Sequence, residues 1–179
     1  MSVKITYFVH GTTTDNEEGL STGQNDGELS ELGVKQSKDL PGQVKDKSFV
    51  EVFSSDLRRA IDSSEISFGE NRQIRIDVRL RECDYGKLNG SKEEKVDYSE
   101  HIDNPFPDGE CLKDVEERMR NFLKFLKRNY SGKHIAIVAH KAPQLALEVL
   151  TNNKTWKEAI EQDWRKVGKW QPGWIYTVK

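Results

Sequence analysis

The stretch YFVHGTTTDN (residues 7–16) joins a short apolar run to a histidine, a glycine and a polar segment. The apolar residues end abruptly at His10, and a polar segment and then acidic residues follow. This pattern is typical of a buried strand that leaves a sheet and delivers an imidazole to its edge. A histidine at such a place is more often tolerated than reactive, so its role depends on the rest of the chain.

Apolar runs of strand length alternate with amphipathic stretches of helix length. The run QIRIDVRL (73–80) alternates at period two, which is typical of an edge strand, and residues 111–130 carry the clearest apolar face at helical spacing. This order predicts an α/β domain with a largely parallel sheet, and no linker or repeat divides residues 1–179. The expected strands are 4–9, 48–55, 73–80 and 133–140, and the expected helices are 29–40, 56–67, 111–130 and 142–150.

Composition excludes several classes of partner. The 28 Lys and Arg residues nearly balance 30 Asp and Glu residues, so neither nucleic acid nor an anionic membrane is expected as a partner. No apolar run approaches the roughly 18 to 20 residues of a membrane span, and the N-terminus does not resemble a signal peptide. Cys83 and Cys111 form no disulfide framework or metal-type spacing. A cytoplasmic location is the expectation.

Three strand ends carry groups that bind anions. His10 and His140 each end an apolar strand, and Arg59 lies in the first turn of a helix that leaves a third strand. The carboxyl ends of parallel strands meet at one edge of a sheet, where ligands bind. Two imidazoles, a guanidinium and a helix N-terminus at that edge indicate an anion site, and phosphate is the obvious candidate.

Other phosphate chemistries lack their motifs. The chain contains no P-loop, no nucleophile elbow, and no arginine at the spacing from a cysteine that a thiolate phosphatase needs. The four histidines are scattered, so no metal-ligand cluster is expected. Imidazole as the phosphoryl acceptor is the chemistry that remains, and it requires neither a metal nor an organic cofactor.

At this point the sequence resembles the histidine phosphatase superfamily, the phosphoglycerate mutase-like group. VHGTTTDN (9–16) is similar to its signature Arg-His-Gly-x-Thr-x-x-Asn in every fixed position except the first, where Val9 stands for arginine. Further similar blocks follow in family order to about residue 150: GELSELGVKQS, SSDLRRAIDSS, LRECDYGKLNG, FPDGECLKDVEERM and IAIVAHK. The resemblance implies a three-layer α/β/α sandwich with a mostly parallel central sheet.

The resemblance also implies roles for individual residues. His10 would attack phosphorus through one ring nitrogen while a backbone carbonyl holds the proton on the other, and Glu82 would serve as acid and then as base. Arg59 and His140 would hold the non-bridging oxygens. The expected substrate- and phosphate-binding residues are Gly11, Thr12, Thr13, Asn16, Gly23 and Lys141, with backbone amides of Gly11 and Thr12 among the donors.

Val9 is the main departure from the family pattern. Loss of the arginine removes a charge-assisted hydrogen bond worth roughly 1.5–3 kcal/mol. Lys141, which stands where glycine is usual after the second histidine, is the substitute cation that the sequence offers. Arg58 and Arg81 are weaker substitutes, because alternate residues point away from the site.

Three functions are therefore open. A phosphatase for a small phosphomonoester is favoured, a phosphoglycerate mutase is the second, and a catalytically impaired phosphate-ligand binding or regulatory protein is the third. Specificity is expected from residues 17–28 and 91–110, the latter beginning with a charged insertion near the cleft. The Trp-rich tail is expected to pack, and His101 and His134 are assigned no role in the site. The oligomeric state is open, a homodimer included.

Overall fold

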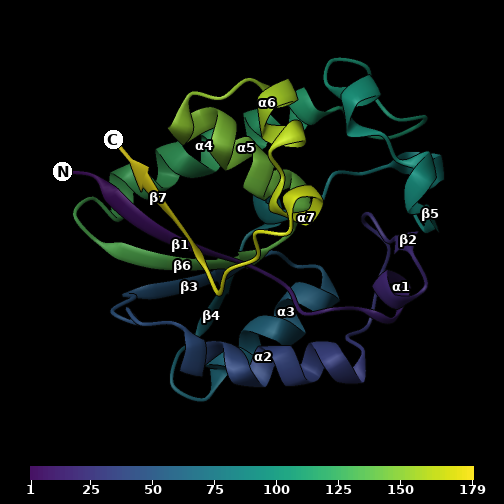
Figure 1. Cartoon of the computed structure of the whole chain (residues 1–179). Coiled ribbons are helices and arrows are strands. Elements are labelled where there is room, and N and C mark those ends of the chain that lie inside the picture. Colours follow the sequence, from purple (N-terminus) through teal and green to yellow (C-terminus); the bar gives the residue numbers. More distant parts are fainter.

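A five-stranded sheet forms the centre of the computed structural model, which describes residues 1–179 (Figure 1). Its strand order is β4-β3-β6-β1-β7. β1, β3, β4 and β6 pair in parallel, and only β7 runs antiparallel, beside β1. The mostly parallel sheet is confirmed. The strand bounds are β1 (Val3–Val9), β3 (Glu51–Ser54), β4 (Ile74–Ile76), β6 (His134–Ala139) and β7 (Trp174–Val178).

Helices cover both faces of the sheet, which confirms the three-layer sandwich. In Figure 1, α2 (Glu31–Gln43) and α3 (Arg58–Ser64) lie on one side of the sheet. On the other side lie α4 (Leu112–Asn129), α5 (Lys141–Asn152) and α6 (Trp156–Glu161). No helix in the chain has both the length and the apolar character needed to cross a bilayer.

Both faces of the central sheet are buried under helices. Every residue of β6 is buried, as expected for a central parallel strand covered twice. The larger core cluster, of 28 residues, includes the apolar stripe of α4, and the smaller cluster of six lies around Phe8 and Phe49. The stripe expected on helix 111–130 is confirmed, since all six of its members are buried: Leu112, Val115, Met119, Phe122, Leu123 and Leu126.

Several element boundaries differ from the expectations. The strand expected over 73–80 contains only Ile74–Ile76, because the Asp77 side chain accepts the amide of Arg79 and starts a 3₁₀ turn over Val78–Leu80. The helix expected over 56–67 is α3, continued by a π-helical turn at Glu65–Gly69. α2 runs through Pro41 rather than ending before it.

Short elements gather near the carboxyl edge of the sheet. β2 (Leu20–Ser21) pairs with β5 (Ser91–Lys92), so the charged insertion begins as a short strand. It then turns through two 3₁₀ helices, Glu93–Lys95 and Tyr98–His101, and buries Tyr98. The other members are α1 (Thr14–Glu17), a 3₁₀ turn at Gly86–Leu88, and α7 (Trp164–Val167).

The Trp-rich tail packs against the core and also forms a strand of the sheet. Trp156 is buried in the core, which confirms packing for that residue, and Trp164 stacks on Trp174 with ring centroids 5.3 Å apart. The final segment is the edge strand β7, which the sequence reading did not predict. It was missed because its strand character depends on a partner, β1, at the other end of the chain.

Candidate active site

The two strand ends with histidines lie side by side, as expected. Val9 of β1 pairs with Ala139 of β6 in parallel register, so the next residue of each strand occupies the same edge. The ring centroids of His10 and His140 are 5.1 Å apart. Sheet register alone therefore brings together two imidazoles that are far apart in the sequence.

The imidazole of His10 is held in one tautomer. Its Nδ1–H donates to the carbonyl of Gly11 at 2.7 Å, which leaves a lone pair on Nε2. Burial, reinforced by the positive charge of Arg59, lowers the pKa of His10 to about 3. At neutral pH the ring is uncharged and Nε2 is a nucleophilic atom.

Arg59 is fixed against His10 from the first turn of α3. Its Nε–H donates to His10 Nε2 at 3.3 Å, and its terminal nitrogens donate to the carbonyls of Gly23 at 2.6 Å and Asn25 at 3.1 Å. Gly23 has a φ of +60°, and a Cβ there would lie 1.8 Å from a side-chain oxygen of Asn89. Gly23 therefore orients Arg59 through its carbonyl, and a larger residue would displace this loop.

His140 is buried, neutral and oriented by Ser55. The amide of Leu57 donates to Ser55 Oγ, and that hydroxyl lies 2.6 Å from His140 Nε2. Because Nε2 is the only acceptor that this hydroxyl contacts, we assign the hydroxyl hydrogen to Nε2 and the imidazole proton to Nδ1, a buried atom with no partner in the protein. Burial, with the charge of Arg59 second, lowers the pKa of His140 well below 6.5.

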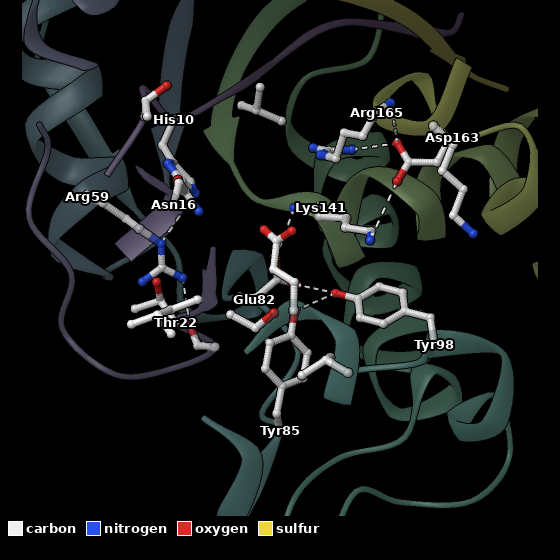
Figure 2. A pocket seen from close by; sticks show the side chains of 18 of the residues that line it. His10, Asn16, Thr22, Arg59, Glu82, Tyr85, Tyr98, Lys141, Asp163 and Arg165 are labelled. Carbon is white, nitrogen blue, oxygen red and sulfur yellow. Dashed lines mark hydrogen bonds and ion pairs between the residues drawn. The ribbon is translucent and has the colours of Figure 1, made fainter. Parts of the chain in front are cut away.

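Glu82 lies at the N-terminal turn of α5, opposite His10 and Arg59 in the cavity (Figure 2). Its carboxylate accepts the backbone amides of Cys83, Lys141 and Ala142 at 2.8–3.1 Å. The hydroxyl of Tyr98 donates to it at 3.2 Å. Burial, with the charge of Glu82 second, raises the pKa of Tyr98 far above 10, so the phenol stays a donor.

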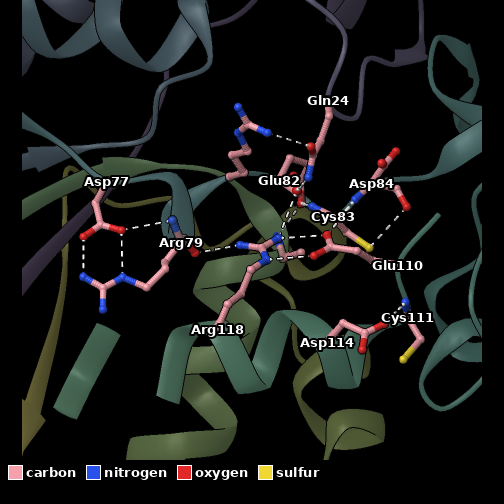
Figure 3. Close-up of polar contacts among 12 residues, drawn as sticks. Gln24, Asp77, Arg79, Glu82, Cys83, Asp84, Glu110, Cys111, Asp114 and Arg118 are labelled. Carbon is pink, nitrogen blue, oxygen red and sulfur yellow. Dashed lines mark hydrogen bonds and ion pairs between the residues drawn. The ribbon is translucent and has the colours of Figure 1, made fainter. Parts of the chain in front are cut away.

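A second layer holds the backbone that carries Glu82 (Figure 3). Arg118 of α4 makes two contacts with Glu110, at 3.0 and 3.1 Å, and donates to the carbonyls of Arg79 at 2.7 Å and Glu82 at 3.0 Å. Glu110 accepts the amide of Asp84 on the other side of Glu82. This network fixes the loop from residue 79 to residue 84 against α4.

The groups surround a cavity of about 610 Å³. Of the predicted site residues, His10, Thr12, Asn16, Gly23, Arg59, Glu82 and Lys141 line it, as does Val9. The predicted residues His140, Gly11 and Thr13 do not. The two segments expected to give specificity, residues 17–28 and 91–110, also line it, through residues that include Thr22 and Tyr98. Sequence reasoning missed the lining residues Tyr85, Asp163, Trp164, Arg165 and Lys166. Asp163, Arg165 and their neighbours come from the tail, which carries no motif that could have indicated them.

A cluster of three charged residues stands across the cavity from His10 (Figure 2). The Asp163 carboxylate, almost fully buried, pairs with Arg165 at 2.8 Å and with Lys141 at 3.7 Å. The Lys141 ammonium also lies 4.5 Å from the centroid of the Tyr98 ring. Burial lowers the pKa of Lys141, and the charge of Asp163 partly opposes that shift.

Some predicted binding groups are already engaged within the protein. The amide of Gly11 donates to Ser63 at 2.9 Å and that of Thr12 donates to Gln36 at 2.9 Å, so the expectation that both amides are phosphate donors is wrong here. Thr13 is fully buried, and its hydroxyl caps α1 by accepting the amide of Asn16. The Asn16 carbonyl oxygen accepts the Thr13 amide in return, which leaves its NH₂ group to face the cavity.

Comparison with known proteins agrees with this geometry. Residues 7–152 match the model of the histidine phosphatase superfamily (branch 1). The chain is 28% identical to phosphoserine phosphatase 1 of Hydrogenobacter thermophilus, covering 81% of this chain and 74% of that protein. It is 32% identical to fructose-2,6-bisphosphatase TIGAR B of Danio rerio, covering 75% of this chain and 57% of that protein.

Mutases and solved phosphatases are also similar. The 2,3-bisphosphoglycerate-dependent phosphoglycerate mutase of Methylorubrum populi is 29% identical, over 83% of this chain and 78% of the mutase. A mycobacterial glucosyl-3-phosphoglycerate phosphatase, solved with VO₃, superimposes with a TM-score of 0.76 at 26% identity, over 89% of this chain and 86% of that one. The match to the family model covers most of the residues that build the sheet and the site. This chain belongs to the histidine phosphatase superfamily (branch 1).

Proposed function

We propose that the protein is a phosphatase that hydrolyses a small phosphomonoester through a phosphohistidine on His10. One observation carries the proposal: His10 holds its proton on Nδ1 through the Gly11 carbonyl, so Nε2 faces Arg59 with a lone pair. A histidine kept only for packing does not need a tautomer aligned with a buried guanidinium. Glu82, in the same cavity, supplies the acid that a binding protein would not require.

The reaction has two transfers. In the first, His10 Nε2 forms a bond to phosphorus as the bond to the ester oxygen breaks, and Glu82, which takes up a proton from solvent as the dianionic ester binds, gives that proton to the leaving alkoxide. In the second, Glu82 takes a proton from water, the water oxygen bonds to phosphorus, and the electron pair of the breaking P–N bond returns to Nε2. Inorganic phosphate leaves, and no metal or organic cofactor takes part.

The remaining groups bind the phosphoryl oxygens. Arg59 neutralises charge beside the attacking nitrogen. His140 is fully buried behind the cavity lining, with its ring centroid 5.1 Å from that of His10, so its Nδ1–H would reach only a phosphoryl oxygen that lies against the His10 ring. The NH₂ group of Asn16 is a second neutral donor from the cavity wall, and Lys141 adds positive charge near Glu82.

Two alternatives remain in the same site. Similarity to a phosphoglycerate mutase supports phosphoryl transfer back to a second hydroxyl rather than to water. Val9, an apolar residue at the cavity wall, supports a protein that binds a phosphorylated ligand with little turnover. Retention of both His10 and Glu82 favours the phosphatase over the second alternative.

The deciding experiment compares hydrolysis of p-nitrophenyl phosphate in EDTA by wild type and by His10→Ala. Wild-type turnover that vanishes in the variant is expected, and acid-labile, base-stable phosphate should be trapped on the wild-type chain alone. His101→Gln is the matched control, because His101 stacks on Phe106 outside the cavity and should leave the rate unchanged.

A panel of natural phosphate esters then tests the substrate class. Phosphoserine, 3-phosphoglycerate, glucosyl-3-phosphoglycerate and fructose 2,6-bisphosphate sample the activities named for the relatives. Release of inorganic phosphate supports the phosphatase, and isomerised phosphoglycerate without phosphate release supports the mutase. No turnover of any ester, with retained phosphate binding, would refute the enzyme and leave the binding protein.

A further inference from the structure

Arg165 is a cavity residue that the tail carries to the site. Its guanidinium donates to the buried Asp163 at 2.8 Å and to Gln144 at 3.4 Å, and it packs 4.4 Å from the centroid of the Trp164 ring. Gln144 belongs to α5 and is itself buried, so two elements hold the guanidinium from behind. Figure 2 shows this guanidinium directed from the Asp163 side into the cavity that His10 also lines.

The charges around Arg165 leave positive charge for a ligand. Asp163 neutralises one of its two cationic neighbours, Lys141 and Arg165, and its side chain is only 1% exposed. Lys166, from the same short helix α7, lines the cavity as well. The buried Asp163 carboxylate holds Lys141 and Arg165 in place, but burying it costs desolvation free energy. That cost is best explained if an anion completes the site.

Arg59 keeps only one N–H on each terminal nitrogen for a phosphoryl group. Its terminal nitrogens each commit an N–H to a backbone carbonyl, and its Nε–H is the group that faces His10. Position 9, next to His10, is a valine and contributes no donor to the cavity it lines. Arg165 spends one N–H of each terminal nitrogen on Asp163 and Gln144, which leaves its other N–H groups free.

Arg165 is also close enough to His10 to affect it. The positive charge of Arg165 is among the causes that lower the pKa of His10, after burial and Arg59. A phosphoryl group on Nε2 would lie in the cavity that Arg165 and Trp164 also line.

We propose that Arg165 binds the non-bridging oxygens of the transferred phosphoryl group and supplies the guanidinium that position 9 lacks. This inference rests on the proposed function, because it assigns the phosphoryl group to the cavity of His10. The buried Asp163, Gln144 and Trp164 pre-organise the guanidinium, so little side-chain freedom is lost when the anion binds. A cation from the end of the chain thereby replaces one from the end of the first strand.

The test measures binding of inorganic phosphate and orthovanadate by calorimetry, together with turnover. Arg165→Gln should weaken both anions about tenfold to a hundredfold, the effect of losing one charge-assisted contact. Arg58→Gln is the matched control, because Arg58 is 60% exposed and pairs only with Glu28 and Asp62 on the surface. That control should leave binding and turnover unchanged.

Restoring the guanidinium at position 9 gives the sharper test. Val9→Arg should recover most of the lost affinity in the Arg165→Gln background and gain much less in the wild type. Equal gains in both backgrounds would overturn the proposal, because the two positions would then act independently. Unchanged anion affinity in Arg165→Gln, with a higher KM only for substrates that bear a second anionic group, would assign Arg165 to the leaving group and also overturn it.

Further measurements distinguish anion binding by Arg165 from misfolding of the variant and from a lack of turnover. Thermal melts report whether Arg165→Gln folds, and Arg165→Lys, which keeps a partner for Asp163 but lacks the planar fork, should still bind phosphate several-fold more weakly. Anion binding requires no catalysis. A wild type without turnover, whose phosphate affinity depends on Arg165, would refute the phosphatase and support this inference.

Discussion

At the scale of the residue, one hydrogen bond controls the chemistry of His10. The Gly11 carbonyl holds the proton on Nδ1, and Arg59 faces Nε2, so the two ring nitrogens have different tasks. Burial keeps both His10 and His140 uncharged far below the pKa of a free imidazole. His10 Nε2 therefore already carries the free lone pair that the proposed nucleophilic attack requires before a substrate enters.

The low pKa of His10 predicts how stability changes with pH. Below pH 6.5 the unfolded chain binds a proton on this ring, whereas the folded chain does not until about pH 3. Stability is therefore lost as pH falls through this window, by up to about 1.4 kcal/mol per pH unit for this group. We expect His10→Gln to flatten the pH dependence of the unfolding free energy, measured by urea denaturation between pH 7 and pH 4. Parallel curves for the two proteins would contradict the neutral, buried ring.

Glu82 predicts a dependence on the leaving group. Glu82→Gln removes the proton donor but keeps an acceptor for the amides of Lys141 and Ala142. Turnover of alkyl phosphates, whose alkoxides need protonation, should fall about 10²- to 10⁴-fold, and p-nitrophenyl phosphate should suffer much less in its first transfer. Single-turnover rates over esters of graded leaving-group pKa measure this. Equal losses across the series would assign Glu82 to positioning alone.

At the scale of the element, helix α4 acts on the site without touching the cavity. Arg118 reaches from α4 to the carbonyls of Arg79 and Glu82, and its partner Glu110 holds the amide of Asp84. The amphipathic pattern of α4 predicts the helix. The stretch FPDGECLKDVEERM, which resembles the family, includes Arg118 but does not indicate its partner. Only the packing of α4 against the loop reveals these contacts, through which Arg118 would position Glu82, the proposed acid.

Arg118→Ala should therefore let the loop that carries Glu82 move and impair proton transfer by Glu82. We expect a kcat decrease of about tenfold or more for poor leaving groups, a smaller loss for p-nitrophenyl phosphate, and an unchanged phosphate Kd. Stability should fall by roughly 1.5–3 kcal/mol, since charge-assisted hydrogen bonds to buried carbonyls are lost. Arg120→Ala is the control on the same helix, because Arg120 is 46% exposed and pairs with Glu116. A uniform loss over all substrates would contradict a role through Glu82.

At the scale of the whole molecule, the tail closes one edge of the sheet and completes the cavity. β7 pairs with β1 along Val3–Tyr7, and α7, just before it, brings Asp163 and Arg165 to the site. Trp164 stacks on Trp174, which ties α7 to the start of β7. The edge strand and the cation cluster are thus one unit in space.

Removal of residues 170–179 should damage both functions of this unit. The uncovered edge of β1 is expected to lower Tm and promote aggregation, because its backbone N–H and C=O groups lose their partners. Anion binding should weaken as well, since Trp164 of α7 loses its stacking partner Trp174. Ile175→Thr is the control, because Ile175 is 56% exposed on β7. Scanning calorimetry and light scattering measure the outcome, and an unchanged Tm would contradict this account.

The sequence by itself determined the sheet-and-helix order, the convergence of His10 and His140, and the partners Arg59 and Glu82. The convergence of His10 and His140 follows from local pattern, because apolar runs of strand length end at those residues and parallel strands share an edge. Arg59 follows from a helix that leaves a third strand, whereas Glu82 was indicated only by the family resemblance. Tertiary structure alone decided that the Gly11 and Thr12 amides are already engaged, that β7 borders β1, and that Arg165 reaches the cavity. Such features depend on contacts between segments distant in sequence, and a single residue such as Arg165 carries no periodicity or spacing that would reveal its partner.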